Sequence, residues 1–195
     1  RGSAATRVNA EGLIESVATN IPRIDYTTGE GVVLLEPQST NLVTYSEDFT
    51  SWNSYQATAN TTTSPSGNSA LFLDFEDVRM FPTTTVLNST EYTSSIYLKS
   101  NKVADVRIRD AAGVDKTISL TTNWVRHEYT ATSVSTSSNA LLIDARFSEG
   151  LGASGLEIAM FGAQLEALPY ATSYIPTSGA IATRLADKVT GAGDA

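Results

Sequence analysis

The sequence predicts an all-β protein built as an antiparallel sandwich or barrel. Apolar and polar residues alternate through the middle of the chain, and this alternation is typical of half-buried strands. Turn-forming residues separate the alternating stretches at intervals of about ten residues, as in sandwiches and barrels. Helical patterns are scarce, apart from one turn expected at 46–51 with Ser46 as its cap.

Each alternating stretch assigns its residues to a core face or an outer face. In 92–99, Tyr92, Ile96 and Leu98 are expected to face the core, with Tyr97 on the opposite face. In 156–166 we expect Leu156, Ile158 and Met160 on one side. In 103–110 we expect Val106 and Ile108 inward and Arg107 and Arg109 outward, and in 114–120 we expect Val114, Ile118 and Leu120 inward. The stretch 124–130 has rings on both faces. In 140–147 we expect Ile143 and Phe147 inward, and Leu142, Asp144 and Arg146 outward.

The chain divides into three zones by composition. Residues 1–40 are turn-rich and are expected to pack on the sandwich or on a neighbouring subunit. Residues 41–166 hold the strand pattern, and residues 167–195 are expected to form an extended C-terminal segment or linker. Because the chain begins at Arg1 without a methionine, we expect it to be part of a longer polypeptide.

Composition excludes several classes of function. The net charge of -8 disfavours a nucleic-acid partner, which normally calls for a basic surface, and an anionic membrane would repel the chain. No apolar run reaches the roughly 18–20 residues of a membrane span. There are no cysteines, so disulfides and thiolate metal sites are absent. The single histidine, His127, rules out a multi-histidine metal site within the chain.

Catalytic motifs are not apparent, and we expect no enzymatic activity. His127 lies inside an expected strand, and the chain has no Gly-x-Ser-x-Gly nucleophile elbow. The segment 150–155 matches G-x-G-x-x-G, but it joins two strands rather than opening a helix. No pair of carboxylates stands out as an acid and base.

No cofactor is expected, with a structural calcium ion kept as an alternative. Calcium prefers the oxygen ligands that loops of β-proteins gather. Asp74, Glu76 and Asp77 are clustered, and Asp110 and Asp115 flank a turn, although neither group matches the twelve-residue calcium loop.

Carbohydrate binding is the function that the outer faces favour. Sugars present apolar C–H faces to aromatic rings and hydroxyls to charged and amide groups. If the strands are neighbours, their outer faces form one surface that would suit an acidic polysaccharide. The alternatives are ordinary cross-strand charge pairs and, for Trp52 and Trp124, core or interface positions. The candidate residues are Tyr97, Arg107, Arg109, Asp144, Arg146 and Trp52.

A series of short phrases runs through the chain in a fixed order. The phrases are ATRVNAEGLIE (5–15), PRIDY (22–26), LLEPQSTNL (34–42), YSEDF (45–49) with Trp52, YLK (97–99), WVR (124–126), GAQLE (162–166), TSYIPT (172–177), TR (183–184) and AD (186–187). Together they resemble a module of tailed-bacteriophage virion proteins (tail fibres, tail spikes and head fibres or spikes) and of related prophage-like particles. The resemblance implies a carbohydrate-binding-like jelly roll on a particle surface, with no catalytic residue and no fixed ligand set.

The primary interpretation is a non-enzymatic adhesin that contacts host-surface polysaccharide from the surface of a virion or particle. One alternative is a purely structural or oligomerisation module, and another is an accessory carbohydrate-binding module of a secreted polysaccharide-degrading enzyme. The resemblance implies other virion proteins as partners and a homo-oligomer, with a trimer favoured. Within or across chains, we expect Arg7, Arg23 and Arg184 to pair with Glu15, Glu36 or Asp187.

Overall fold

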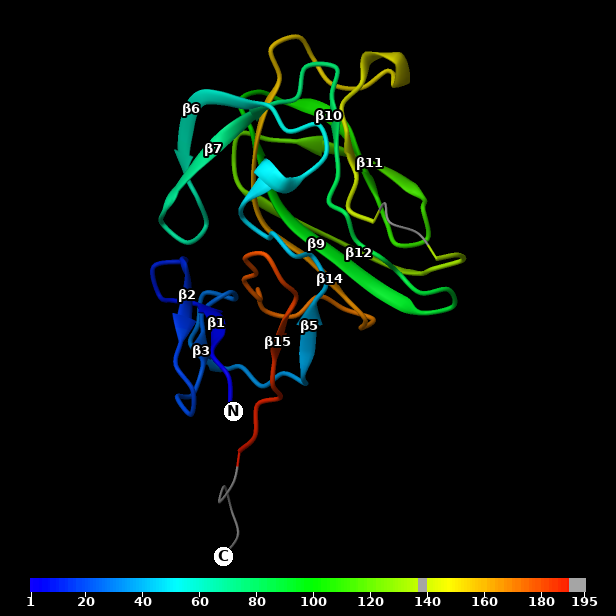
Figure 1. Ribbon diagram of the computed structural model, residues 1–195. Coiled ribbons are helices and arrows are strands. Elements are labelled where there is room, and N and C mark those ends of the chain that lie inside the picture. The colour runs from blue at the N-terminus through cyan, green and yellow to red at the C-terminus, as the bar shows by residue number, and fades with distance from the viewer. Residues whose placement is uncertain (137–139, 190–195) are drawn as a thin grey trace, which may run out of the picture.

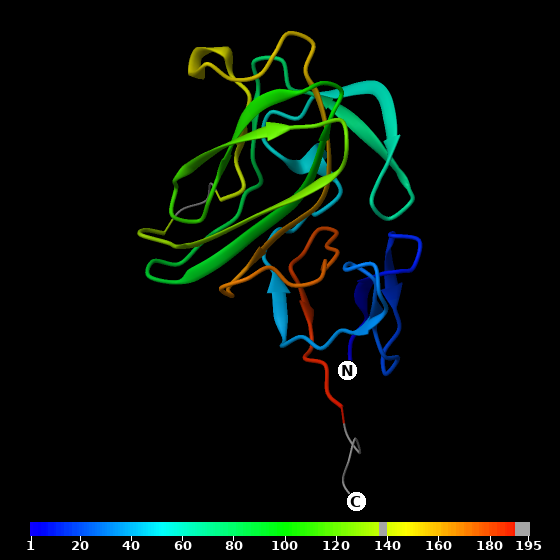
Figure 2. The ribbon, with the colours of Figure 1, turned by 180° about the vertical axis from the view of Figure 1, so that it is seen from behind.

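Two antiparallel β-sheets face each other in a jelly-roll sandwich, as the computed structural model shows for residues 1–136 and 140–189 (Figures 1 and 2). The larger sheet has five strands in the order β12 (Val125–Thr132), β9 (Glu91–Ser100), β14 (Glu157–Glu166), β7 (Ser69–Asp74) and β6 (Ala57–Thr63). The smaller sheet has the order β11 (Asp115–Leu120), β10 (Ala104–Arg109), β13 (Ile143–Asp144) and β8 (Arg79–Met80).

The main hydrophobic core fills the space between the two sheets. Ile96 and Leu98 of β9 meet Val106 and Ile108 of β10 there, and all four side chains are fully buried. These positions confirm the core faces predicted for the two strands. Val114 is an exception, because it is half exposed in the turn that precedes β11.

The five-stranded sheet is covered on its other face as well. Thr93 and Ser95 alternate with the core residues of β9, yet each is only 1% exposed. The segment that follows β14 crosses this face, where the carbonyl of Leu168 accepts a hydrogen bond from Thr93. The strand pattern could not reveal this cover, because serine and threonine are equally common on solvated faces.

The stretch 140–147 departs from the predicted strand. Only Ile143 and Asp144 pair as a strand, and the chain then turns at the 3₁₀ element η2 (Phe147–Glu149). Leu142 and Asp144 were expected outside and are buried, whereas Phe147 was expected inside and is 45% exposed. The chain leaves the sheet after two residues, so strict alternation does not hold.

In the described part of the chain, helical structure is limited to short 3₁₀ turns. The turn expected at 46–51 is η1 (Phe49–Ser51), and its cap is Asp48, whose carboxylate accepts from the N–H of Thr50. Ser46 is instead buried against the hydroxyl of Tyr174. Among residues 1–136 and 140–189, no helix has the length and apolar character needed to cross a membrane.

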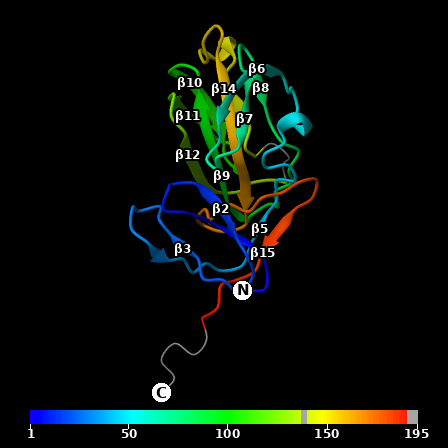
Figure 3. The ribbon, with the colours of Figure 1, turned by 90° about the vertical axis from the view of Figure 1, so that its left-hand side faces the viewer.

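The terminal segments form three small antiparallel pairs beside one end of the sandwich (Figure 3). Asn9 closes the first hairpin, because its side-chain oxygen accepts from the N–H groups of Glu11 and Leu13. Residues 190–195 of the expected C-terminal segment lie outside the described residues. The pairs are β1 (Ala5–Val8) with β2 (Ile14–Val17), β3 (Ile24–Asp25) with β4 (Val32–Val33), and β5 (Ser39–Asn41) with β15 (Ala182–Arg184).

A fully buried asparagine joins three parts of the chain. The side-chain amide of Asn41 donates to the carbonyls of Ala163 at 3.0 Å and Ile175 at 2.9 Å. Its oxygen accepts from the N–H groups of Val43 at 3.0 Å and Leu165 at 3.2 Å. Every hydrogen-bonding position of the amide is used, so Asn41 fixes β5, β14 and the C-terminal segment relative to one another.

Arginine side chains also tie the two terminal segments together. Arg23, whose side chain is 0% exposed, pairs with Glu36 at 2.7 Å and with Asp187. Arg184 lies 3.4 Å from the same Glu36. The predicted pairing of these arginines is therefore confirmed within one chain, and Arg7 pairs with Glu15 at 2.7 Å.

Replacing Asn41 with alanine should lower the free energy of unfolding by about 3 kcal/mol, because buried groups left without a partner cost about 1–3 kcal/mol each. Urea denaturation measures the change. Thr40→Ala is the matched control, since among the described residues this neighbouring hydroxyl bonds to that of Thr183 alone, in an exposed position. Equal shifts for the two variants would contradict the role given to Asn41.

Stability should depend on Asp187 in a pH-sensitive way. Burial alone would raise the pKa of this carboxyl, but hydrogen bonds from Arg23, the N–H of Glu36 and Arg1 outweigh burial and lower the pKa. A lowered folded pKa stabilises the protein above the unfolded value of about 3.9, and the contribution is lost as the pH falls through the folded pKa.

We therefore expect Asp187→Asn to cost about 3–5 kcal/mol at pH 7 and progressively less below pH 4, as urea denaturation at several pH values would measure. Asp115→Asn is the control, because it removes an exposed ion pair with Arg109 worth about 0–1 kcal/mol. A loss in Asp187→Asn that did not change with pH would refute the assignment.

Candidate functional site

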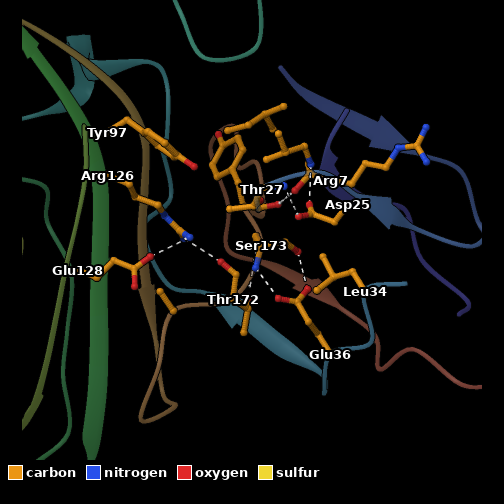
Figure 4. A pocket seen from close by; sticks show the side chains of 15 residues that line it. Arg7, Asp25, Thr27, Leu34, Glu36, Tyr97, Arg126, Glu128, Thr172 and Ser173 are labelled. Atoms are coloured by element: carbon orange, nitrogen blue, oxygen red, sulfur yellow. Dashed lines mark hydrogen bonds and ion pairs between the residues drawn. The ribbon is translucent and has the colours of Figure 1, made fainter. Parts of the chain in front are cut away.

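An open cleft of about 530 Å³ lies between the five-stranded sheet and the N-terminal segment. This volume is in the range of about 300–1,000 Å³ found for small-molecule sites. Figure 4 shows Tyr97, Arg126 and Glu128 on the sheet side, with Arg7 and Asp25 opposite them. The cleft is thus assembled from segments that are far apart in the sequence.

Tyr97 presents its hydroxyl to the cleft from the outer face of β9 (Figure 4). Its ring packs edge-on against Phe161 at 6.0 Å, and the guanidinium of Arg126 lies 5.6 Å from the ring centre. Burial raises the pKa of the Tyr97 phenol, so the hydroxyl stays protonated at neutral pH. It is a neutral group that both donates and accepts hydrogen bonds.

A β-bulge in β14 brings the chain close to this tyrosine. Pairing with β9 shifts register between Phe161 and Gln164, and Gly162 adopts a φ of 64°. A β-carbon at Gly162 would lie 3.4 Å from Tyr174 and 3.5 Å from Tyr97. Glycine therefore satisfies both the backbone conformation and the close approach of the two rings.

Arg126 is held by partners on three sides. Its guanidinium pairs with Glu128 at 2.9 Å and donates to the hydroxyl of Ser95 at 3.0 Å and the carbonyl of Thr172 at 2.8 Å. Arg126 and Glu128 alternate on β12, so both face the cleft. The strand pattern and the C-terminal segment together fix this charge pair.

Asp25 is a buried carboxylate on the opposite wall. It accepts from the N–H groups of Val8 at 2.8 Å and Thr27 at 2.9 Å. Burial alone would raise its pKa, but hydrogen bonds from Thr27 and Val8 outweigh burial and lower it. Asp25 is therefore ionised at neutral pH and suited to accepting hydrogen bonds rather than to donating a proton.

Glu36 and Ser173 lie at the base of the cleft. The carboxylate of Glu36 accepts from the N–H of Ser173 at 2.7 Å and from its hydroxyl at 2.6 Å. The same carboxylate pairs with Arg23 behind the cleft. The base is thus continuous with the arginine cluster that joins the terminal segments.

The cleft combines apolar and hydrogen-bonding surface. Val8, Ile14 and Leu34 supply aliphatic side chains beside the charged groups. Such a lining fits a ligand with both C–H faces and hydroxyls. Glu36 and Glu128 are held by arginines, and Asp25 accepts hydrogen bonds from two backbone N–H groups.

The predicted outer surface contains Arg107, Arg109 and Arg146, which lie on or beside the four-stranded sheet. Arg107 pairs with Glu149 at 2.7 Å, and Arg109 pairs with Asp115 at 2.7 Å. Arg109 and Asp115 form a cross-strand pair between β10 and β11, whereas Glu149 reaches Arg107 from η2, so each guanidinium is neutralised by a carboxylate.

Asp144 is not the outward-facing group that the strand pattern predicts. Its side chain is only 4% exposed and accepts two hydrogen bonds, at 2.8 and 2.6 Å, from the guanidinium of Arg146. Burial would raise its pKa, but these bonds and one from the N–H of Arg146 lower it. The carboxylate fixes Arg146 over the sheet and is largely hidden from solvent.

Tyr97 and Trp52 do not join the arginine surface. Tyr97 lies on the other sheet, because β9 and β10 belong to different layers of the sandwich. Trp52 is 4% exposed, with its ring packed against Phe49 and its indole N–H bonded to the carbonyl of Tyr45. Trp52 is therefore a core residue rather than a stacking platform.

Trp124, the second tryptophan of the chain, is partly buried near the cleft. It packs against the cluster of Ile14, Phe161 and Tyr174, and its indole donates to the carbonyl of Thr63 at 2.7 Å. This places it at an internal contact between the sheet and the N-terminal segment.

Sequence reasoning missed Arg7, Asp25, Arg126 and Glu128 as cleft residues. Alternation along single strands cannot bring together segments that are a hundred residues apart. A signal was present, however, since all of these except Glu128 lie in phrases on which the family resemblance rests. Their convergence in space is what defines the cleft.

The expected calcium positions serve as turn caps. Asp74 accepts from the N–H of Glu76, Glu76 from that of Gly155, and Asp77 from that of Phe147. Asp110 accepts from the N–H of Val114. In the described part of the chain, no three acidic or histidine side chains are grouped as a metal site.

His127 provides a direct check of the fold of β12. It alternates with Arg126 and Glu128, so it faces away from the cleft, and burial lowers its pKa below 6.5. We expect an NMR titration of this single histidine to give a pKa below 6.5 in the folded protein. A value at or above 6.5 would mean that His127 is solvated or charge-paired, contrary to its position.

No protein-family model matches the chain, and no curated protein matches it by sequence. Among solved structures, one described as "CBM4 structure and function" has a TM-score of 0.44 and 14% identity, covering 60% of this chain and 94% of its own. The N-terminal cellulose-binding domain of Cellulomonas fimi β-1,4-glucanase C has a TM-score of 0.40 and 13% identity, covering 68% of this chain and 89% of its own.

A third similar structure is the enzymatically active domain of tailspike protein 4 of bacteriophage CBA120. Its TM-score is 0.37 at 13% identity, over 64% of this chain and 21% of the tailspike chain. All three TM-scores lie below 0.5.

Proposed function

We propose that this chain is a non-catalytic adhesin module that binds host-surface carbohydrate in the cleft between the five-stranded sheet and the N-terminal segment. The observation that carries the proposal is the cleft itself, where Tyr97, Arg126 and Glu128 face Arg7 and Asp25. A saccharide in this position would contact both walls at once.

The chemistry of the lining supports a sugar ligand. Tyr97 both donates and accepts hydrogen bonds, Arg7 donates, and Asp25 and Glu128 accept, which are the pairings that vicinal hydroxyls require. Val8 and Ile14 add apolar surface for sugar C–H groups. An exclusively apolar or exclusively charged cleft would lack one half of this complementarity.

Binding without catalysis is supported by the state of the acidic groups. Asp25 has a lowered pKa, while Glu36 and Glu128 are engaged by arginines. His127 faces away from the cleft. Glycoside cleavage needs a protonated carboxyl beside an ionised one, and nothing in the lining favours that combination. The proposed function needs no cofactor.

We further propose a setting on the surface of a phage or phage-like particle, as part of a fibre or spike. The resemblance to virion modules is the support, since its phrases supply most of the cleft and the buried polar contacts behind it. Other virion proteins would be the structural partners, and a homotrimer is the expected assembly.

A purely structural module is the second candidate. The same phrases form the buried contacts of Asn41, Arg23 and Glu36, which fix the terminal segments without any ligand. In that case the domain would serve to space or assemble the fibre and would show no glycan affinity.

A glycan array of bacterial surface polysaccharides, followed by titration calorimetry, separates the two candidates. Tyr97→Phe should weaken binding about tenfold, which corresponds to ~1.4 kcal/mol, because it removes the hydroxyl and keeps the ring. Tyr129→Phe is the matched control, since Tyr129 lies against the core on the opposite face of the sheet.

A second matched pair locates the site. Glu128→Ala removes an exposed carboxylate from the cleft and should reduce affinity, whereas Glu149→Ala removes a similar arginine partner from the other sheet and should not. Loss of binding in Glu149→Ala or Arg107→Ala alone would move the site to the arginine surface. Silence across the whole array would favour the structural module.

A further inference from the structure

Every arginine that lines the cleft already has a carboxylate partner. Arg7 pairs with Glu15 at 2.7 Å, and Arg126 pairs with Glu128 at 2.9 Å. Arg126 is also bonded to the carbonyl of Thr172 and the hydroxyl of Ser95. The positive charge of each guanidinium is therefore balanced by its own glutamate before any ligand binds.

The remaining carboxylates make the cleft acidic. Glu36 is balanced by Arg23 at 2.7 Å and Arg184 at 3.4 Å. Asp25, in contrast, is bonded only to uncharged donors and forms no ion pair with any described residue. No cation among the described residues contacts its carboxylate, although Arg23 is near enough to help lower its pKa, and the chain as a whole has a net charge of -8.

An anionic sugar bound in the cleft would be repelled by the nearby carboxylate of Asp25. Arg7 or Arg126 would have to share its single positive charge between its glutamate and the ligand, with the carboxylate of Asp25 on the same wall as Arg7. The arginine surface on the other sheet offers no alternative, because Arg107 and Arg109 are paired in the same way. Both surfaces thus disfavour carboxylate, sulfate and phosphate groups.

We propose that the cleft selects glycans that carry no acidic substituent, which reverses the acidic polysaccharide expected from the arginine content. The inference rests on the proposed carbohydrate-binding function and names the class of sugar that the same cleft accepts. Hydroxyls are the groups that the paired donors and acceptors can bind without breaking an ion pair.

The test compares each uronic-acid-containing polysaccharide with its own carboxyl-reduced form, which keeps the linkage and removes the charge. Affinity electrophoresis and calorimetry on the full chain should show at least tenfold tighter binding to a reduced form. Affinity for that neutral form should change less than twofold between 50 and 500 mM NaCl, because no ion pair is formed with the ligand.

A charge variant gives the complementary result. Glu15 lies outside the cleft lining and neutralises Arg7, so Glu15→Gln should free that guanidinium and raise affinity for the acidic parent about tenfold. Glu149→Gln frees Arg107 on the other sheet and is the matched control, with no gain expected. Circular dichroism and urea denaturation verify that both variants remain folded.

The outcomes distinguish the two proposals. Tighter binding to the acidic parent, or a steep salt dependence, would overturn the neutral class and leave carbohydrate binding intact. Equal affinity for parent and reduced forms would also overturn it. If neither form of any polysaccharide binds, both the neutral class and the proposed function fail.

Discussion

A buried carboxylate explains how the C-terminal segment is fixed to the sandwich. Glu166, the last residue of β14, is 0% exposed and accepts hydrogen bonds from the hydroxyls of Ser39 and Thr172, the N–H of Thr172 and the amide of Gln164. A buried charge of this kind is tolerated only when it is fully bonded, so the segments that supply its donors cannot move independently. The cleft depends on this fixation, because Thr172 and its neighbours form the cleft base.

The buried polar contacts and the cleft form one continuous structure. Gln164 accepts from the N–H of Ile175, Asn41 joins the same segment to β14, and Glu36 connects the cleft to Arg23. The phrases that resemble virion modules occupy both sides of this arrangement.

The five-stranded sheet has different partners on its two faces. One face packs on the four-stranded sheet through aliphatic side chains, as most sandwiches do. The other face carries polar side chains that bond to the terminal segments, together with the rings of Tyr97 and Phe161. The terminal segments cover part of this face. The uncovered remainder is the cleft, so the extent of the terminal segments decides how much of the sheet is available to a ligand.

The all-β class, the positions of the long central strands and the core faces of β9, β10 and β14 could be predicted from the amino-acid sequence. These follow from local alternation, which survives wherever a strand has one apolar face. The sequence also correctly paired Arg7, Arg23 and Arg184 with acidic partners. Tertiary structure alone decided that Tyr97 and the arginines of β10 lie on different sheets, and that Asp144 and Trp52 are buried. Only the fold assembles Arg7, Asp25, Arg126 and Glu128 into one cleft, because those contacts depend on strand order between distant segments and not on the neighbours of each residue along the chain.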